Sequence, residues 1–365
     1  MRLLIVACLL SVAGLLCAAV PALAQGPNWI VDAAKATDSL PPVWASFGAD
    51  EPNYATTADG LHLLDAFASM GKPVYVRLHN LLTTGDGRPA LKWGSTNAYT
   101  TDAAGNPVYD WTILDSIFDA LVHRGLRPLA EIGFMPEALS SHPEPYRHHW
   151  APGNNYNDIF TGWAYPPNDY ARWAALVEAW VRHCVTRYGA PAVRTWYWEV
   201  WNEPNIGYWK GTPAAYDSLY DYTAAAVRRA CPGALVGGPA STGPGWDKAA
   251  DYLRAFLEHC RTTGAPLDFI SFHAKGSPRL AAGHVVMNMT PELRDVETGF
   301  QIVSASSYKN LPILITEFDP EGCAACSVAT NPENAYRNGT MYSSYTAEAF
   351  ARLYDLAGQY HVNLA

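Results

Sequence analysis

Short apolar runs alternate with longer amphipathic segments along most of the chain. The runs are rich in β-branched and aromatic residues, as strands are, and the segments repeat apolar positions every three or four residues, as helices do. In the segment 111–124, for example, one helical face holds Ile113, Leu114, Ile117 and Leu121. The expected strands are 43–49, 74–79, 127–133, 196–203, 235–239, 268–273 and 311–318, and an eighth begins within 362–365. The expected helices lie near 61–70, 111–124, 170–188, 214–230, 246–260, 291–306 and 342–360.

The order of these elements predicts the fold class. Strands that alternate with helices form parallel sheets with covering helices, an α/β architecture. Seven strand–helix repeats and the start of an eighth strand predict a (β/α)8 TIM barrel. A doubly wound sheet is the alternative, but no glycine-rich phosphate loop follows the first strand. Because the eighth strand begins only at Val362, we expect residues 25–365 to be one catalytic domain truncated within strand eight, in a fragment of a longer protein.

The fourth strand ends in a polar pair, Asn202 and Glu203. Pro204 follows and cannot donate to a strand ladder, so the strand should stop there. In a (β/α) barrel the carboxyl ends of the strands carry the active site. A surface turn after a strand is the structural alternative, since asparagine and proline are common in turns. The long polar segment 140–167 is expected to hang over the same end of the barrel.

A second carboxyl, Glu317, closes the seventh strand as Glu203 closes the fourth. Strands four and seven of an eight-stranded barrel face each other across its mouth, so both carboxyls should reach one cavity. Glycoside hydrolysis needs such a pair, with one acid that protonates the leaving oxygen and one carboxylate on the other face of the sugar. A surface acid after a core strand is the alternative for Glu317 alone.

Other polar residues at strand ends are candidates for substrate binding. His79 ends strand two and His273 ends strand six, where each could contact sugar hydroxyls or could be a hydrogen-bonded core histidine. Asn202 could bond the sugar 2-hydroxyl, a contact that strengthens in the transition state. Lys275 follows His273 by two positions and could share its face of the strand, or could be a solvated loop lysine.

The composition and net charge of the chain indicate which classes of ligand it binds. Hydrophobic residues make up 49% and charged residues 16% of the 365 residues, which is enough for a large core. The net charge of −9 argues against nucleic acid as a partner. The chain also has 13 Trp and 21 Tyr, residues that fill cores but also stack against sugars. An oligosaccharide or glycoside is therefore the expected ligand, and no metal or organic cofactor is implied.

The first 24 residues are typical of a secretory signal peptide. Arg2 gives the positive start, residues 3–16 the apolar middle, and residues 22–24 the small-residue cleavage pattern. A membrane anchor is the alternative for these residues. No other segment is long and apolar enough to span a bilayer. We therefore expect a secreted or periplasmic protein with no membrane association after cleavage. In such a protein, Cys323 and Cys326 are expected to form a local disulfide rather than a metal site.

At these residues the chain resembles glycoside hydrolase family 39, the β-xylosidase and α-L-iduronidase family. The similar stretches are WEVWNEPN at 198–205, LVGGPA at 235–240, EIGFMPEAL at 131–139 and ITEF at 315–318. The resemblance covers nearly all of 43–365. It implies a retaining mechanism, with Glu203 as the acid/base and Glu317 as the nucleophile, and it implies a β-rich accessory domain beyond the sequence given.

One departure concerns the sugar. Xylosidases of this family often carry His-x-Tyr at the sixth strand, whereas this chain has His273-Ala274-Lys275-Gly276, closer to the iduronidase pattern in which the lysine meets a uronic acid carboxylate. The sequence therefore predicts a secreted retaining glycosidase, with β-xylosidase action on xylo-oligosaccharides as the first hypothesis. A uronic-acid-releasing glycosidase and a carbohydrate-binding barrel without catalysis are the alternatives.

Overall fold

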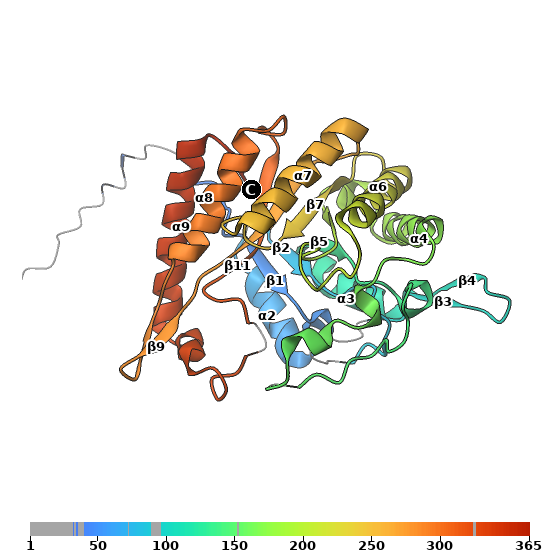
Figure 1. The fold of residues 1–365 in the computed structure, drawn as a ribbon, viewed down its shortest axis with the longest axis horizontal. Coiled ribbons are helices and arrows are strands. Elements are labelled where there is room, and N and C mark those ends of the chain that lie inside the picture. The colour runs from blue at the N-terminus through green and yellow to red at the C-terminus, as the bar shows by residue number, and fades with distance from the viewer. Residues whose placement is uncertain are drawn as a thin grey trace, which may run out of the picture. The chain divides into compact units, whose positions relative to one another are not determined.

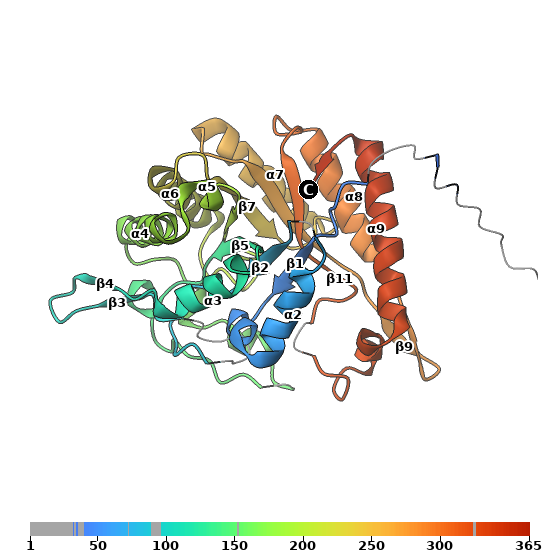
Figure 2. The same cartoon turned by 180° about the vertical axis from the view of Figure 1, so that it is seen from behind.

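Eight parallel strands form one curled sheet at the centre of the fold (Figures 1 and 2). Their spatial order follows their order in the chain, as in a singly wound (β/α)8 barrel and unlike a doubly wound sheet. The predicted fold class is therefore confirmed. The strands are β1 (Ser46–Ala49), β2 (Tyr75–Leu78), β5 (Arg127–Ile132), β6 (Tyr197–Val200), β7 (Leu235–Ser241), β8 (Phe269–Lys275), β11 (Pro312–Asp319) and β12 (Asn363–Leu364).

Helices cover the outer face of this sheet in both views (Figures 1 and 2). The α-helices are α2 (Ala58–Ala68), α3 (Thr112–Val122), α4 (Tyr170–Tyr188), α5 (Ala190–Val193), α6 (Pro213–Ala230), α7 (Asp247–Thr263), α8 (Thr290–Ser304) and α9 (Thr340–Tyr360). The 3₁₀ helices are η1 (Pro52–Thr56), η2 (Glu137–Leu139), η3 (Tyr156–Ile159), η4 (Gly162–Ala164) and η5 (Pro332–Asn338). The seven helices expected from the sequence are all present, with ends that differ by a few residues.

Local chemistry explains where several helices begin and end. The Asp169 carboxylate accepts from the backbone N–H groups of the first turn of α4, and Thr212 caps α6 just before Pro213. Such caps satisfy donors that have no partner inside the helix. Gly264 ends α7 at a φ of 73°, a left-handed conformation that glycine adopts without steric cost. The turn at Gly264 keeps the connection from α7 to β8 short, at the end of the barrel opposite the strands' carboxyl ends.

Two hairpins were not expected from the sequence. β3 (Tyr99–Thr101) pairs with β4 (Pro107–Tyr109), and β9 (Arg279–Ala281) pairs with β10 (His284–Val286). Both hairpins follow a barrel strand on its carboxyl side, so they are insertions in the connections that rim the mouth.

Large aromatic side chains fill the layer between strands and helices. Five tryptophans are among the largest fully buried side chains, and edge-to-face or tilted contacts join several of them. These residues therefore build the core rather than a sugar-stacking surface. They are Trp173, Trp180, Trp196, Trp198 and Trp201.

The computed structural model describes residues 32, 34, 35, 40–71, 73–88, 96–151, 153–323 and 326–365. The predicted signal peptide, residues 1–24, lies outside them. Within the described ranges, none of the helices has the length and apolar character needed to cross a membrane. Cys323 and Cys326 form the expected disulfide.

Candidate active site

The chain turns sharply after β6, and this turn presents Glu203 at the barrel mouth. Trp201 and Glu203 have φ angles of 70° and 44°, in the left-handed region that residues other than glycine rarely adopt. Such conformations persist where the surroundings fix them, often at functional sites. The buried Trp201 indole N–H donates to the Tyr208 carbonyl at 3.0 Å, and the Glu203 N–H donates to the Ala240 carbonyl at 2.8 Å. These contacts hold the position of the first carboxyl.

A register shift in β11 presents Glu317. Pairing between β11 and β8 shifts between Ile315 and Glu317, so Thr316 has no partner in the register. A bulge of this kind redirects the side chains that follow it and is frequent beside active sites. Beyond the bulge, Glu317 stands opposite His273 of β8.

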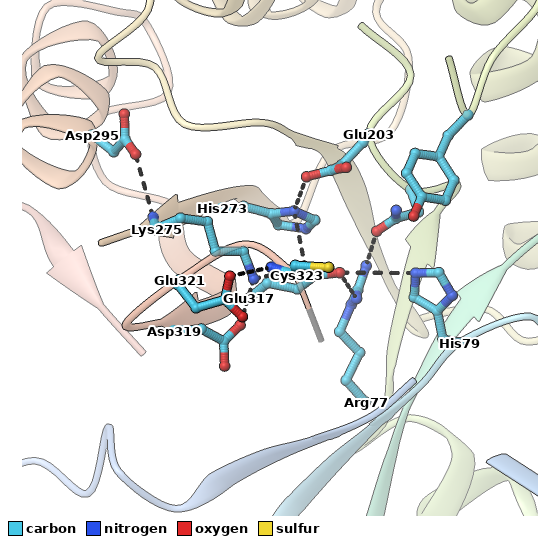
Figure 3. Close-up of polar contacts among 12 residues, drawn as sticks. Arg77, His79, Glu203, His273, Lys275, Asp295, Glu317, Asp319, Glu321 and Cys323 are labelled. Carbon is cyan, nitrogen blue, oxygen red and sulfur yellow. Dashed lines mark hydrogen bonds and ion pairs between the residues drawn. The ribbon is translucent and has the colours of Figure 1, made fainter. Parts of the chain in front are cut away.

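The two carboxyls meet at His273 (Figure 3). The His273 Nδ1 atom lies 2.9 Å from Glu203 Oε1 and 3.6 Å from Glu317 Oε2. One oxygen of each carboxyl and one imidazole nitrogen all lie within 4.8 Å of one another. The structure therefore brings together the residues that the sequence placed at the ends of strands four, six and seven. A sugar ring that enters between the carboxyls would have one on each face.

The buried Arg77, on β2, forms a hydrogen-bonded ion pair with Glu317. Its Nη1 atom donates to Glu317 Oε1 at 3.0 Å, and its Nε and Nη2 atoms donate to Glu199 at 2.7 Å and Glu131 at 3.2 Å. Glu131 and Glu199 have no exposed surface. Sequence analysis did not single out this network, although Glu199 is a lone charge in an apolar strand. It ties the second catalytic candidate to the barrel interior.

Charge keeps Glu317 ionised. Burial alone would raise its pKa, but nearby His273, Lys275 and Arg77 outweigh burial and hold the pKa of this carboxyl well below its ordinary range. A carboxylate in this state can act as a nucleophile but is a poor proton donor.

Lys275 also contacts Glu317. Its ammonium donates to Glu317 Oε2 at 2.9 Å and to the Asp319 carboxylate. Burial alone would lower the pKa of Lys275, but these two negative charges outweigh burial and raise the pKa above the ordinary lysine range. Its backbone N–H donates to Asp295 at 3.3 Å (Figure 3). The expectation that Lys275 shares the face of His273 holds. In this state the ammonium is paired with protein carboxylates.

Asn202 and His79 occupy different levels of the site. Asn202 Oδ1 accepts from Arg77 at 2.9 Å, which leaves its amide nitrogen as the donor available to the cavity that Asn202 lines. His79 lies behind Glu317, with Nε2 at 3.1 Å from Glu131 and at 3.8 Å from Glu317, and Nδ1 at 3.0 Å from Asn80. Asn202 therefore lines the cavity, whereas His79 contacts Glu131 and Glu317.

A cavity of about 470 Å³ contains both carboxyls. Tyr156, from the long segment 140–167, and Tyr208 also line it, and their hydroxyls are 2.5 Å apart. Burial, together with the neighbouring Tyr156 and Glu203, raises the pKa of Tyr208 well above its ordinary range. A larger cavity of about 700 Å³ lies between β1 and β11, but Glu203 does not line it. The smaller cavity is therefore the candidate active site.

Glu203, His273 and Glu317 are also spaced to hold a metal ion. However, both Glu317 oxygens already accept from cations, Arg77 on Oε1 and Lys275 on Oε2. A metal cation at this point would meet two fixed positive charges at short range, which opposes its binding. The donor set therefore fits acid–base chemistry better than a resident metal.

Comparison with known proteins identifies the family. The family described as "Glycosyl hydrolases family 39" matches residues 29–362. The chain belongs to glycosyl hydrolase family 39. It is 31% identical over 283 residues to a β-xylosidase of Geobacillus stearothermophilus, a match that covers 75% of this chain and 50% of that protein. It is 28% identical over 283 residues to the α-L-iduronidase of Canis lupus familiaris, which covers 72% of this chain and 38% of that protein.

A solved family 39 structure shows the same relation. The chain superposes on a β-xylosidase from Caulobacter crescentus with a TM-score of 0.64 and 29% identity, a match that covers 84% of this chain and 59% of the other. The chain thus spans about half or less of the length of the curated relatives it matches.

Proposed function

We propose that this chain carries the catalytic site of a retaining glycosidase that hydrolyses O-glycosidic bonds. In this proposal it acts as a β-xylosidase on xylo-oligosaccharides. The observation that carries the proposal is the meeting of Glu203 and Glu317 at His273, within 4.8 Å, in one cavity. Retaining enzymes place their carboxyls about 5 Å apart, whereas inverting enzymes need about 6.5–9.5 Å to admit a water. The short separation supports retention.

We assign the roles of the two carboxyls from the family resemblance, and the lowered pKa of Glu317 supports its role as the nucleophile. The Glu317 carboxylate attacks the anomeric carbon while Glu203 gives its proton to the leaving oxygen, and the bond between that oxygen and the anomeric carbon breaks. A water then loses a proton to Glu203 and attacks the same carbon, which releases the sugar and restores Glu317. The Asn202 amide, which lines the cavity, donates to the sugar 2-hydroxyl in both transition states in this proposal.

The choice of a xyloside rests on two lines of support. Two relatives, from Geobacillus stearothermophilus and Caldicellulosiruptor saccharolyticus, are named β-xylosidases. In addition, Lys275 is already paired with Glu317 and Asp319, which suits a neutral sugar. A uronide is the second candidate, because Lys275 lines the cavity and its ammonium could turn to a sugar carboxylate.

Removal of the nucleophile tests the reaction. Glu317→Ala should lower turnover of an aryl xyloside by several orders of magnitude, because the covalent intermediate cannot form. A mechanism-based fluorosugar should label Glu317, as peptide mass spectrometry would show. The matched control is Glu137→Ala, which removes an exposed glutamate and should turn over like the parent. Labelling of a different carboxyl would contradict the assignment.

Removal of the acid tests the other role. Glu203→Ala should lose natural disaccharides far more than aryl glycosides with good leaving groups, since only the poor leaving group needs a proton. Added azide should restore turnover of the aryl substrate and give a glycosyl azide. NMR of the first product from the parent should show the retained anomeric configuration. Equal losses on both substrate classes, or an inverted product, would count against the mechanism. A parent that binds xylo-oligosaccharides but cleaves none would favour the carbohydrate-binding alternative.

We also propose that the protein is exported. The support is the charged start, apolar middle and small-residue end of residues 1–24. Expression with this leader should give a periplasmic or extracellular protein whose N-terminal sequence begins at Gln25. An uncleaved N-terminus anchored in membranes would support the membrane-anchor alternative instead.

A further inference from the structure

The segment that follows β11 carries a further carboxylate, that of Glu321, into the wall of the active-site cavity. Glu321 accepts from the Cys323 backbone N–H at 2.7 Å through one oxygen and from the Arg337 guanidinium through the other. Both its oxygens are thus held, and its side chain is only 14% exposed. Figure 3 shows Glu321 beside Cys323. The two donors form a recess of the kind that binds a carboxylate through charge-assisted hydrogen bonds.

The donors of this recess are fixed in place. Cys323, which carries the N–H group, is joined to Cys326 by a disulfide. Arg337, from η5, also donates to the carbonyls of Cys323 at 2.8 Å and Cys326 at 3.1 Å, and Asn334 donates to the Cys326 carbonyl at 3.3 Å. Donors held in this way would keep their geometry if the carboxylate that they bind were replaced by another.

The recess belongs to the catalytic cavity. Glu321, Cys323 and Arg337 line the same cavity as Glu203 and Glu317. Two cationic side chains, Lys275 and Arg337, line this cavity. Lys275 forms an ion pair with Asp319, and Arg337 forms one with Glu321. A sugar carboxylate that enters this cavity would meet like charges and would find the favourable donors occupied. A neutral sugar would meet no such penalty.

We propose that Glu321 is a specificity-determining residue: it fills the recess formed by Arg337 and the Cys323 N–H and so excludes glycosides that carry a carboxylate. This inference rests on the proposed function, in which the substrate is a neutral glycoside. The discrimination comes from a repulsive element as well as from attraction to the favoured sugar, as specificity often requires. Glu321 acts on sugar choice and takes no part in bond breaking.

Substitution of Glu321 should open the recess. In Glu321→Ala, the kcat/KM ratio of an aryl glucuronide or iduronide to an aryl xyloside should rise about tenfold or more over the parent, which corresponds to ~1.4 kcal/mol. Calorimetry with free glucuronate, which needs no turnover, should show tighter binding by a similar factor, while xylose shows no such gain. Glu321→Gln removes the charge but keeps the side-chain volume and one acceptor oxygen, so it should give a smaller gain and guards against loss of folding in the alanine variant.

Controls separate the recess from general charge effects. Glu333→Ala removes the same charge from the neighbouring η5 and should leave the ratio at the parent value. Glu321→Ala combined with Arg337→Met should lose the gain, because the cationic donor is then absent. The inference is overturned if both Glu321 variants fold but keep the parent's ratio and glucuronate affinity. A parent that prefers uronides would overturn it together with the xyloside proposal. If the parent is inactive on both substrates but Glu321→Ala gains glucuronate affinity, the proposed function is refuted and the inference about Glu321 is not.

Discussion

A buried carboxyl whose electrostatic neighbours include Lys275 and Asp319 makes the stability of the fold depend on pH. Glu292, on α8, has no exposed surface, and it accepts from the Tyr345 hydroxyl at 2.5 Å. Burial is the main cause that raises its pKa from 4.5 to about 8, with smaller opposing effects from Tyr345 and Lys275 and a reinforcing one from Asp319. In the folded protein Glu292 is therefore protonated at neutral pH, whereas in the unfolded chain it is ionised.

The sign and size of the effect follow from linkage. The folded state binds the proton more tightly, so this contribution to stability is fully present below about pH 4.5 and is lost as the pH rises through about 8. Between these values the free energy of unfolding should fall by ~1.4 kcal/mol per pH unit because of this group. The full effect is a loss on the order of 5 kcal/mol, a large part of the stability of an ordinary domain.

Glu292→Gln removes the titration and keeps the shape. The amide oxygen can still accept from Tyr345, so the variant should match the parent near pH 5 and exceed it increasingly up to pH 8, by several kcal/mol. Urea unfolding followed by circular dichroism at pH 5, 6, 7 and 8 measures the difference. Glu137→Gln, at an exposed carboxyl, should run parallel to the parent. Parallel curves for the parent and Glu292→Gln would refute the assignment of a raised pKa.

Two further variants test the charges around Glu317. Lys275→Ala removes a cation that lowers the pKa of Glu317. With a xyloside as substrate, the acid limb of the pH profile of kcat/KM should therefore move to higher pH. An acid limb at the parent's pH would show that Lys275 does not set this pKa. Arg77→Met leaves Glu131 and Glu199 buried without their cation and should cost ~3–5 kcal/mol of unfolding free energy, whereas Arg254→Met, at an exposed pair with Asp251, should cost at most about 1 kcal/mol. Similar costs for both arginine variants in urea unfolding would contradict the buried network.

The barrel could be predicted from the sequence because its signals are local. Each strand is an apolar run, each helix an amphipathic segment, and Glu203, His273 and Glu317 stand where such runs end. The β3–β4 and β9–β10 hairpins were missed, because strands of three residues are too short to show a period.

Contacts between distant residues could not be predicted in this way. Glu199 stands out in its strand, but its partner Arg77 lies 122 residues away, and nothing local to either residue names the other. Tyr156 and Arg337 lie on short 3₁₀ helices and Glu321 lies in the loop after β11, segments too short or irregular to show a period, so sequence analysis left them out of the site. The sequence thus located the two candidate carboxyls and the neighbouring His273 and Lys275, but not Arg77 or the contacts around Glu321.

The barrel interior explains why Glu317 has so fixed a position. Glu131 of β5 and Glu199 of β6 are partners in the strand register, so two buried carboxyls stand side by side. Two like charges in that position need a cation between them, and Arg77 supplies it. Since the same guanidinium also donates to Glu317 and Asn202, the charge that stabilises the interior also orients the proposed nucleophile and the amide beside it. Mid-strand substitutions should therefore alter the chemistry, whereas substitutions in the loop after β11 should alter the choice of sugar.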